Sequence, residues 1–195
     1  FEKNEEPGGM LRYGIPSYKL DKEVIKAEID IMREIGVEIK CGIEVGKDIT
    51  IDDLRKQGYK GFYVAIGCQG GRLPGIPGED LEGVMTAIDF LHEANCGQLV
   101  ESPKTALLKD KSVVVVGGGN VAIDAARVAK RSGASEVTML SLETEDIMPA
   151  SLEERMEARE DGVVINPGWG PKEVQRDKVQ STKVAGITFK RCTSV

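Results

Sequence analysis

The sequence predicts an α/β fold with a parallel β-sheet, and three observations within residues 112–142 carry this prediction. A run of valines at 113–116 is typical of a strand that is buried on both faces, as in a parallel sheet. Three glycines at 117–119 follow the run, and an Ala-rich segment at 120–131 then has helical periodicity. A second apolar segment at 136–142 completes a strand–helix–strand unit.

Helix caps and apolar periodicity define the elements that precede this unit. Asp21 is a candidate N-cap for a helix through Ile35, with apolar residues at helical spacing, and Gly36 would end that helix. Thr50 would cap a short helix at 51–57. The other elements expected before residue 112 are strands at 1–3, 37–40 and 62–67 and a helix at 86–94.

The residues after the strand–helix–strand unit are expected to alternate between helix and strand. Ser151 and Glu154 have the spacing of a capping box, which predicts a helix through Glu160 that Gly162 ends. The strands expected beyond it are 163–166 and a pair at 172–174 and 184–191. Upstream, the segment 70–78 is rich in glycine and proline and is interpreted as a linker, with a break in organisation near residue 80.

Composition excludes several classes of function. A chain of 195 residues with 41% apolar residues and 23 glycines suits an α/β protein. The net charge of −6 argues against a nucleic-acid partner, and no apolar run approaches the roughly 20 residues of a membrane helix. The four cysteines are widely spaced and form no Cys-x-x-Cys motif, which indicates reduced thiols and a cytoplasmic protein.

The glycine turn predicts a binding site for a dinucleotide. A strand, a tight glycine turn and a helix hold a pyrophosphate at the helix N-terminus, where backbone N–H groups are free. Gly117 would make the turn, Gly119 would let the backbone approach the phosphates, and Ala122 would allow close helix–strand packing. One alternative is that the unit binds no ligand. For Asn120 a separate alternative is that it is the helix N-cap and does not contact the pyrophosphate. The residues expected to bind the dinucleotide are Gly117, Gly118, Gly119, Asn120 and Val121.

Glu143 predicts the kind of dinucleotide. It follows Gly119 at about the distance, roughly 20 residues, at which an acidic side chain meets the ribose 2′-hydroxyl of NAD. A carboxylate accepts hydrogen bonds from hydroxyl groups and repels a 2′-phosphate, so NAD(H) is expected in preference to NADP(H). The alternative is that Glu143 is one solvated charge in the acidic run 143–146.

The order of these segments resembles that of the flavin-dependent pyridine nucleotide oxidoreductases. The resemblance is to the type that includes the small subunit of glutamate synthase and the flavin-containing half of dihydropyrimidine dehydrogenase. Residues 8–16, Gly-Gly-Met-Leu-Arg-Tyr-Gly-Ile-Pro, resemble a signature of that family, and residues 64–67 resemble its second FAD motif. Residues 117–124, together with 148–150 downstream, resemble its nicotinamide site.

The resemblance implies two Rossmann-like domains within an internal fragment of a longer protein. Residues 1–83 would be part of an FAD-binding domain that lacks its first strand and its Gly-x-Gly-x-x-Gly loop. Residues 84–195 would be a three-layer NAD(P)-binding domain, inserted in the FAD domain of the parent protein. The residues that would contact FAD in the parent are Glu2, Gly9, Met10, Leu11 and Gly67.

The resemblance also implies a reaction, in which hydride passes from NADH to FAD and electrons pass onward to an iron–sulfur domain or subunit. Since the cofactors carry this chemistry, no catalytic residue and no metal ligand is assigned. Members that use NADPH have paired arginines where this chain has Leu142 and Glu143, which again favours NADH. We expect the isolated chain to hold FAD poorly and to be inactive without it. The alternatives are an NAD(H)-binding module without redox activity of its own and a purely structural domain.

Overall fold

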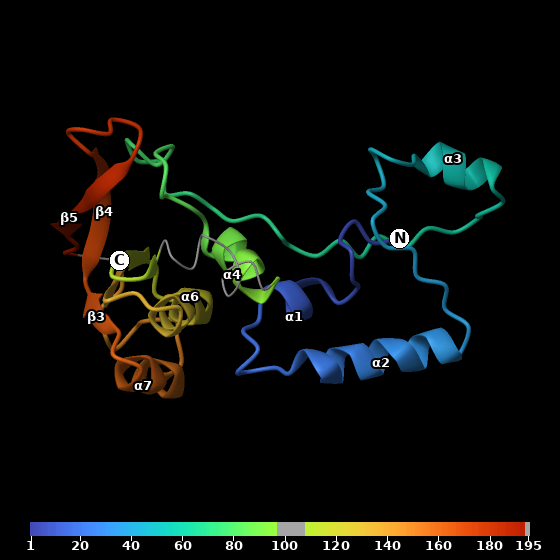
Figure 1. Ribbon diagram of the computed structural model, residues 1–195, viewed down its shortest axis with the longest axis horizontal. Helices are drawn as coiled ribbons and strands as arrows, with labels where there is room; N and C mark the ends of the chain where they lie inside the picture. The colour runs from blue at the N-terminus through green and yellow to red at the C-terminus, as the bar shows by residue number, and fades with distance from the viewer. Residues whose placement is uncertain (97–107, 194–195) are drawn as a thin grey trace. The chain divides into compact units, whose positions relative to one another are not determined.

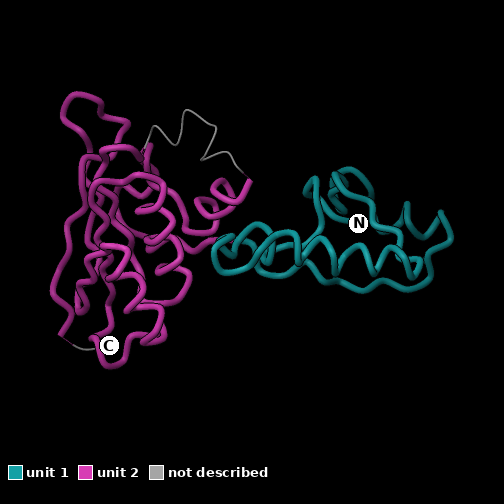
Figure 2. The backbone as a smooth tube through the Cα atoms, turned by 60° about the horizontal axis from the view of Figure 1, so that its bottom comes forward, with its two compact units in different colours: residues 1–69 teal, residues 70–195 magenta. Residues whose placement is uncertain are grey.

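The computed structural model describes residues 1–96 and 108–193, and it divides the chain into two compact units (Figures 1 and 2). Unit 1 comprises Phe1–Gln69 and unit 2 comprises Gly70–Val195. Unit 1 contains the helices α1 (Gly9–Tyr13), α2 (Lys22–Glu34) and α3 (Ile51–Lys56).

The N-caps of α2 and α3 are those that the sequence predicts, whereas α1 was not predicted. The Asp21 side chain accepts a hydrogen bond from the Glu23 backbone N–H at the start of α2, and Thr50 forms a full capping box with Asp53 at the start of α3. Ile25 and Ile29 are buried on the apolar face of α2, as expected. The C-terminal end of that face, at residues 32 and 35, is exposed instead.

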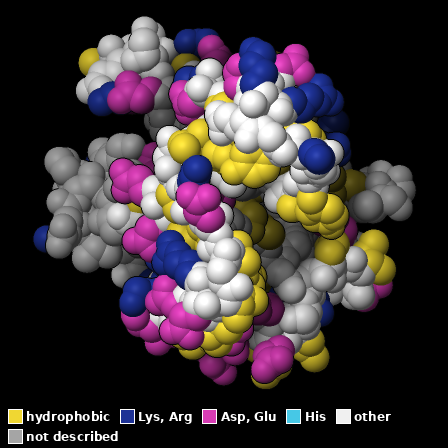
Figure 3. Space-filling model, turned by 90° about the vertical axis from the view of Figure 1, so that its right-hand side faces the viewer, with side chains coloured by type: hydrophobic (Ala, Val, Ile, Leu, Met, Phe, Trp, Pro, Cys, Tyr) yellow, Lys and Arg dark blue, Asp and Glu magenta, His cyan; other side chains and the backbone are white. Residues whose placement is uncertain are grey.

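The strands expected at 1–3, 37–40 and 62–67 are not present as strands. The backbone near the N-terminus is nevertheless paired: Glu2 N–H donates to the Lys40 carbonyl at 2.8 Å, and Ile43 N–H donates to the Glu2 carbonyl at 3.0 Å. Tyr63 is 93% exposed and Ile66 77% exposed, so the prediction of a buried strand there was wrong. An apolar run becomes a buried strand only against neighbouring strands, and none covers this run among the described residues. Hydrophobic side chains also lie open on the face shown in Figure 3.

Unit 2 contains a parallel sheet with the strand order β1-β2-β3 and a separate antiparallel pair β4-β5. In the parallel sheet Val113 of β1 is opposite Val137 of β2, and Met139 of β2 is opposite Ile165 of β3. The elements of unit 2 are α4 (Ala87–Asn95), β1 (Ser112–Val116), α6 (Asn120–Arg131), β2 (Glu136–Ser141), α7 (Leu152–Glu160), β3 (Val164–Pro167), β4 (Trp169–Arg176) and β5 (Val184–Arg191).

Helix α6 covers one face of the parallel sheet, and the hydrophobic core of unit 2 includes residues of both. It packs on β1 and β2 and also contacts α4 and α7. Ile123 and Ala126 of α6 and Val137 and Met139 of the central strand β2 are fully buried. On the face of β1 that α6 does not cover, side chains remain accessible, and Val114 is 43% exposed. The prediction that this valine run is buried on both faces was therefore wrong.

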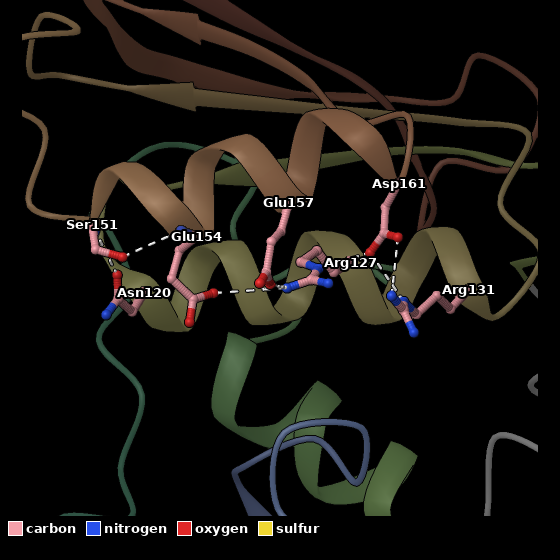
Figure 4. Close-up of polar contacts among 7 residues, drawn as sticks. All are labelled: Asn120, Arg127, Arg131, Ser151, Glu154, Glu157 and Asp161. Carbon is pink, nitrogen blue, oxygen red and sulfur yellow. Dashed lines mark hydrogen bonds and ion pairs between the residues drawn. The ribbon is translucent and has the colours of Figure 1, made fainter.

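The buried side of α6 also includes a charged residue. Arg127 is 5% exposed, whereas the apolar Val121 on the same helix is 51% exposed. The Arg127 guanidinium donates to the carboxylates of Glu157 and Asp161, at the C-terminal end of α7 (Figure 4). Charge neutralisation between the two helices makes this burial possible, since an unpaired buried charge would be strongly destabilising.

Candidate functional site

The glycine turn joins β1 to α6 with the geometry that the sequence predicts. Gly117 adopts φ of 145°, and its N–H donates to the Leu140 carbonyl of β2 at 2.8 Å. A Cβ atom at Gly117 would lie 3.2 Å from the Cβ of Ala122, which shows how closely the helix approaches the end of the strand. Both a glycine at 117 and a small side chain at 122 are needed for this approach.

The N-terminus of α6 presents backbone donors that no side chain occupies. Gly119 is the N-cap, makes no side-chain cap hydrogen bond, and is followed by a first turn without acidic residues. Among the described residues, the N–H groups of Gly118, Gly119, Asn120 and Val121 find no hydrogen-bond acceptor. Such a row of N–H groups at the positive end of a helix dipole is suited to bind an anion such as a phosphate. The alternative that Asn120 is the N-cap was wrong, because that position belongs to Gly119.

Glu143 lies directly after β2 and its carboxylate lies against the glycine turn. A Cβ atom added to Gly118 would be only 2.6 Å from Glu143 Oε2. The backbone of Glu143 is held in place by two donors to its carbonyl, Ser141 Oγ at 3.0 Å and Gly168 N at 2.8 Å. The structure thus brings together the predicted phosphate-binding turn and the predicted ribose-binding carboxylate, although they are far apart in the sequence.

Glu145, which belongs to the same acidic run as Glu143, is bound to α7 instead. Glu145 forms ion pairs with Arg155 and Arg159 of α7, the latter at 2.7 Å. The Glu145 backbone carbonyl also accepts a hydrogen bond from Arg155. These contacts hold the loop after Glu143 against α7, so residues 143 and 145 are not equivalent members of one solvated charge cluster.

Residues 148–151 form a third side of the site, by contacts that sequence spacing does not reveal. Ala150 N–H donates to the Gly118 carbonyl at 2.9 Å, and Ser151 N–H donates to Asn120 Oδ1 at 3.1 Å (Figure 4). Met148 and Ala150 are buried, at 6% and 2% exposure. The segment is therefore anchored in the core while its backbone is bonded to the glycine turn.

The residues expected to contact FAD all lie in unit 1. The Glu2 carboxylate accepts hydrogen bonds from the backbone N–H and the side-chain amide of Asn4, both at 2.9 Å. Gly67 adopts φ of 63°, in the left-handed region, within a segment that forms neither helix nor strand, and there is open space where a Cβ would be. The first three residues of α1 are Gly9, Met10 and Leu11.

Within residues 1–96 and 108–193, no three His, Cys, Asp or Glu side chains are grouped so that they could hold a metal ion. No helix in the same ranges combines the length and apolar character that a membrane crossing requires.

The sequence is similar to known oxidoreductases along nearly its whole length. It is 38% identical to the glutamate synthase [NADPH] small chain of Escherichia coli (strain K12), over 98% of this chain and 41% of that protein. It is also 38% identical to the NAD-dependent dihydropyrimidine dehydrogenase subunit PreT of the same organism, over 92% of this chain and 41% of that subunit. The chain therefore spans about two fifths of the length of these curated relatives.

Solved structures show the same fold. FprA, an oxidoreductase of Mycobacterium tuberculosis, superimposes with a TM-score of 0.74 at 18% sequence identity, over 98% of this chain and 59% of FprA. This likeness supports the α/β, Rossmann-like fold class. The family model of the pyridine nucleotide-disulphide oxidoreductases matches residues 8–191. The chain thus belongs to the pyridine nucleotide-disulphide oxidoreductase family.

Proposed function

We propose that this chain is the nicotinamide-binding part of a flavoprotein oxidoreductase that passes hydride from NADH to FAD and electrons onward. The observation that carries the proposal is the position of the Glu143 carboxylate beside Gly118, next to the open N–H groups at the start of α6. In this proposal the N–H groups would hold the phosphates and the carboxylate would accept from the ribose, which is the combination that a dinucleotide requires. In this proposal residues 84–195 bind the dinucleotide, and residues 1–83 contribute Glu2, Gly9, Met10, Leu11 and Gly67 to FAD binding.

The residues of unit 2 fit NADH better than NADPH. The N–H groups of Gly118, Gly119, Asn120 and Val121 would hold the pyrophosphate, and the Glu143 carboxylate would accept hydrogen bonds from the adenosine ribose. A 2′-phosphate beside this carboxylate would meet like charge, without a cation at residue 142 or 143 to compensate. The dinucleotide supplies the hydride when it is bound, and the chain's own role is to place and orient it.

The relatives support a role in electron transfer to another component. Two of them are described as a small chain and as a dehydrogenase subunit, which are parts of larger assemblies. In our proposal the electrons leave the flavin toward an iron–sulfur domain or subunit. Relatives are named for NADPH as well as for NAD, so the preference for NADH in this chain depends on Leu142 and Glu143.

Titration of the 195-residue chain with NADH and with NADPH tests the proposal directly. We expect calorimetry to show micromolar binding of NADH and binding of NADPH weaker by at least tenfold, because the 2′-phosphate is repelled by Glu143. Equal affinity for the two nucleotides would contradict the preference. Failure of both to bind would contradict the site itself and would favour a purely structural domain.

The second candidate function, a binding module without redox activity, requires a separate assay. We expect NADH-dependent reduction of an artificial electron acceptor by the chain only when FAD is added, since the protein contributes placement and the flavin contributes the redox chemistry. The control is the same mixture with FAD but without protein. NADH binding without acceptor reduction above that control would favour the binding module for this chain.

A further inference from the structure

The carbonyl of Gly118 and the N–H of Gly119 belong to one peptide group, and among the described residues only the carbonyl of this group is hydrogen-bonded. Its carbonyl accepts the Ala150 N–H at 2.9 Å. A trans peptide is planar, and its C=O and N–H point in opposite directions. The hydrogen bond from Ala150 therefore orients the Gly119 N–H away from residues 148–151 and leaves it free among the described residues.

A second contact fixes the donor segment itself. Ser151 N–H donates to Asn120 Oδ1 at 3.1 Å, and Asn120 is the first residue of α6 (Figure 4). In a carboxamide the oxygen accepts hydrogen bonds and the NH2 group only donates them, so this bond also fixes which end of the Asn120 side chain faces Ser151. Ala150 and Ser151 are adjacent in sequence, so the Gly118–Ala150 and Asn120–Ser151 bonds act side by side.

The start of α7 makes the same segment rigid from the other side. The Ser151 hydroxyl accepts a hydrogen bond from Glu154 N–H at 3.3 Å and thereby caps α7. Ala150, at 2% exposure, is packed in the core. Ser151 thus uses its hydroxyl for α7 and its N–H for Asn120, which ties the N-termini of two helices together.

We propose that Asn120 is a positioning residue for the dinucleotide site: through Ser151 it holds Ala150 against Gly118 and thereby preorients the Gly119 N–H toward the pyrophosphate. We name the two bonds, Gly118–Ala150 and Asn120–Ser151, the 118–151 clamp. The inference rests on the proposed function, because the ligand of the Gly119 N–H is the phosphate of NADH. In this role the Asn120 side chain affects the affinity for NADH by holding the backbone and not by touching the nucleotide.

A double-mutant cycle on the 195-residue chain tests the clamp. Asn120→Ala removes the acceptor, and Ser151→Pro removes the donor at a residue whose φ of −60° suits proline. Each single variant is expected to lower the NADH affinity measured by calorimetry about five- to tenfold, as expected for loss of one preorganising hydrogen bond. The double variant is expected to lose no more than the worse single variant, because both substitutions break the same bond.

Ser151→Ala is the reference for Ser151→Pro, because both variants lose the hydroxyl that caps α7 and only the proline variant also loses the N–H that donates to Asn120. Ser151→Pro is therefore expected to bind NADH more weakly than Ser151→Ala. Thr50→Ala is the matched control, because it removes a capping hydroxyl from α3 in unit 1 and is expected to reduce stability while leaving the NADH affinity as in the wild type. An unchanged affinity in Asn120→Ala would overturn the proposal. Independent, multiplying losses in the double variant would overturn it as well, because Asn120 would then act by a contact of its own.

Hydrogen exchange separates failure of the clamp from failure of the proposed function. In the chain without nucleotide, the Ala150 and Ser151 amides are expected to be protected, and protection at both is expected to fall in Asn120→Ala. If the wild type bound no NADH, the proposed function would fail, and the positioning role with it. If NADH bound but Asn120→Ala left the protection of Ala150 unchanged, only the clamp would fail.

Discussion

Replacing Glu143 by arginine is expected to move the preference of the chain from NADH toward NADPH by about 100-fold. The change removes the carboxylate that we propose as the acceptor for the adenosine ribose, and it places a guanidinium where a 2′-phosphate would lie in that proposal. A charge-assisted hydrogen bond contributes about 1.5–3 kcal/mol, so a tenfold loss for NADH and a tenfold gain for NADPH are both reasonable. Calorimetric titration of the variant with each nucleotide measures the ratio.

Two further variants control for charge and for position. Glu143→Gln keeps the size of the side chain but removes its charge, and it is expected to raise the NADPH affinity several-fold with only a small loss for NADH. Glu160→Arg makes the same reversal of charge at the far end of α7, and it is expected to leave the ratio unchanged. If Glu143→Arg behaved like Glu160→Arg, Glu143 would not contact the ribose.

Replacing Arg127 by alanine is expected to produce the largest loss of stability, about 2–3 kcal/mol in the free energy of unfolding. Arg127 is 5% exposed and donates to Glu157 and to Asp161, the latter at 2.7 Å. Its removal leaves Asp161, at 20% exposure, with a weaker partner and opens a void between α6 and α7. Urea denaturation followed by fluorescence measures the loss, since Trp169 is the single tryptophan and lies in unit 2.

The pH dependence of the stability lost in Arg127→Ala tests whether the ion pair with Asp161 causes that loss. Burial raises the pKa of Asp161, but hydrogen bonds and charges from Arg131 and Arg127 outweigh burial and hold that pKa below its usual value of 3.8. A carboxylate with a depressed pKa stabilises the fold above pH 3.8, and this contribution disappears as the pH falls through the folded-state pKa. The difference between wild type and Arg127→Ala should thus be constant near neutral pH and shrink below about pH 4.

Arg131→Ala is the appropriate comparison for Arg127→Ala. Arg131 also pairs with Asp161, at 3.0 Å, but its side chain is 45% exposed. An exposed ion pair contributes roughly 0–1 kcal/mol, so a loss below 1 kcal/mol is expected. If both variants lost the same free energy of unfolding, the burial of Arg127 would add no stability to the packing of α6 on α7.

Local signals in the sequence were sufficient for α2, α3, α4, α6 and α7 and for the glycine turn, but not for the short helix α1. Asp21, Thr50 and Ser151 each cap the helix that they are expected to cap, because a cap depends on contacts within three residues. Gly117 and Ala122 are five residues apart, and their close approach follows from the strand–turn–helix sequence alone. Family membership could also be recognised from such short motifs.

Burial could not be read from the same patterns. An apolar strand has two faces, and whether both are covered depends on elements elsewhere in the chain. The valines of β1 and the run around Ile66 have similar composition, yet β1 is partly covered by α6, whereas Ile66 is 77% exposed. Arg127 illustrates the opposite case, because an arginine side chain, which is usually exposed, is buried here where α7 supplies carboxylates.

The sequence by itself determined the glycine turn, its place between a strand and a helix, and the acidic residue that follows the next strand. Only the tertiary structure decided that Glu143 lies against Gly118 and that Asn120 is bonded to Ser151. The physical reason is that a turn and a cap are set by neighbouring residues, whereas these contacts exist only after β1, β2 and α7 have packed around α6.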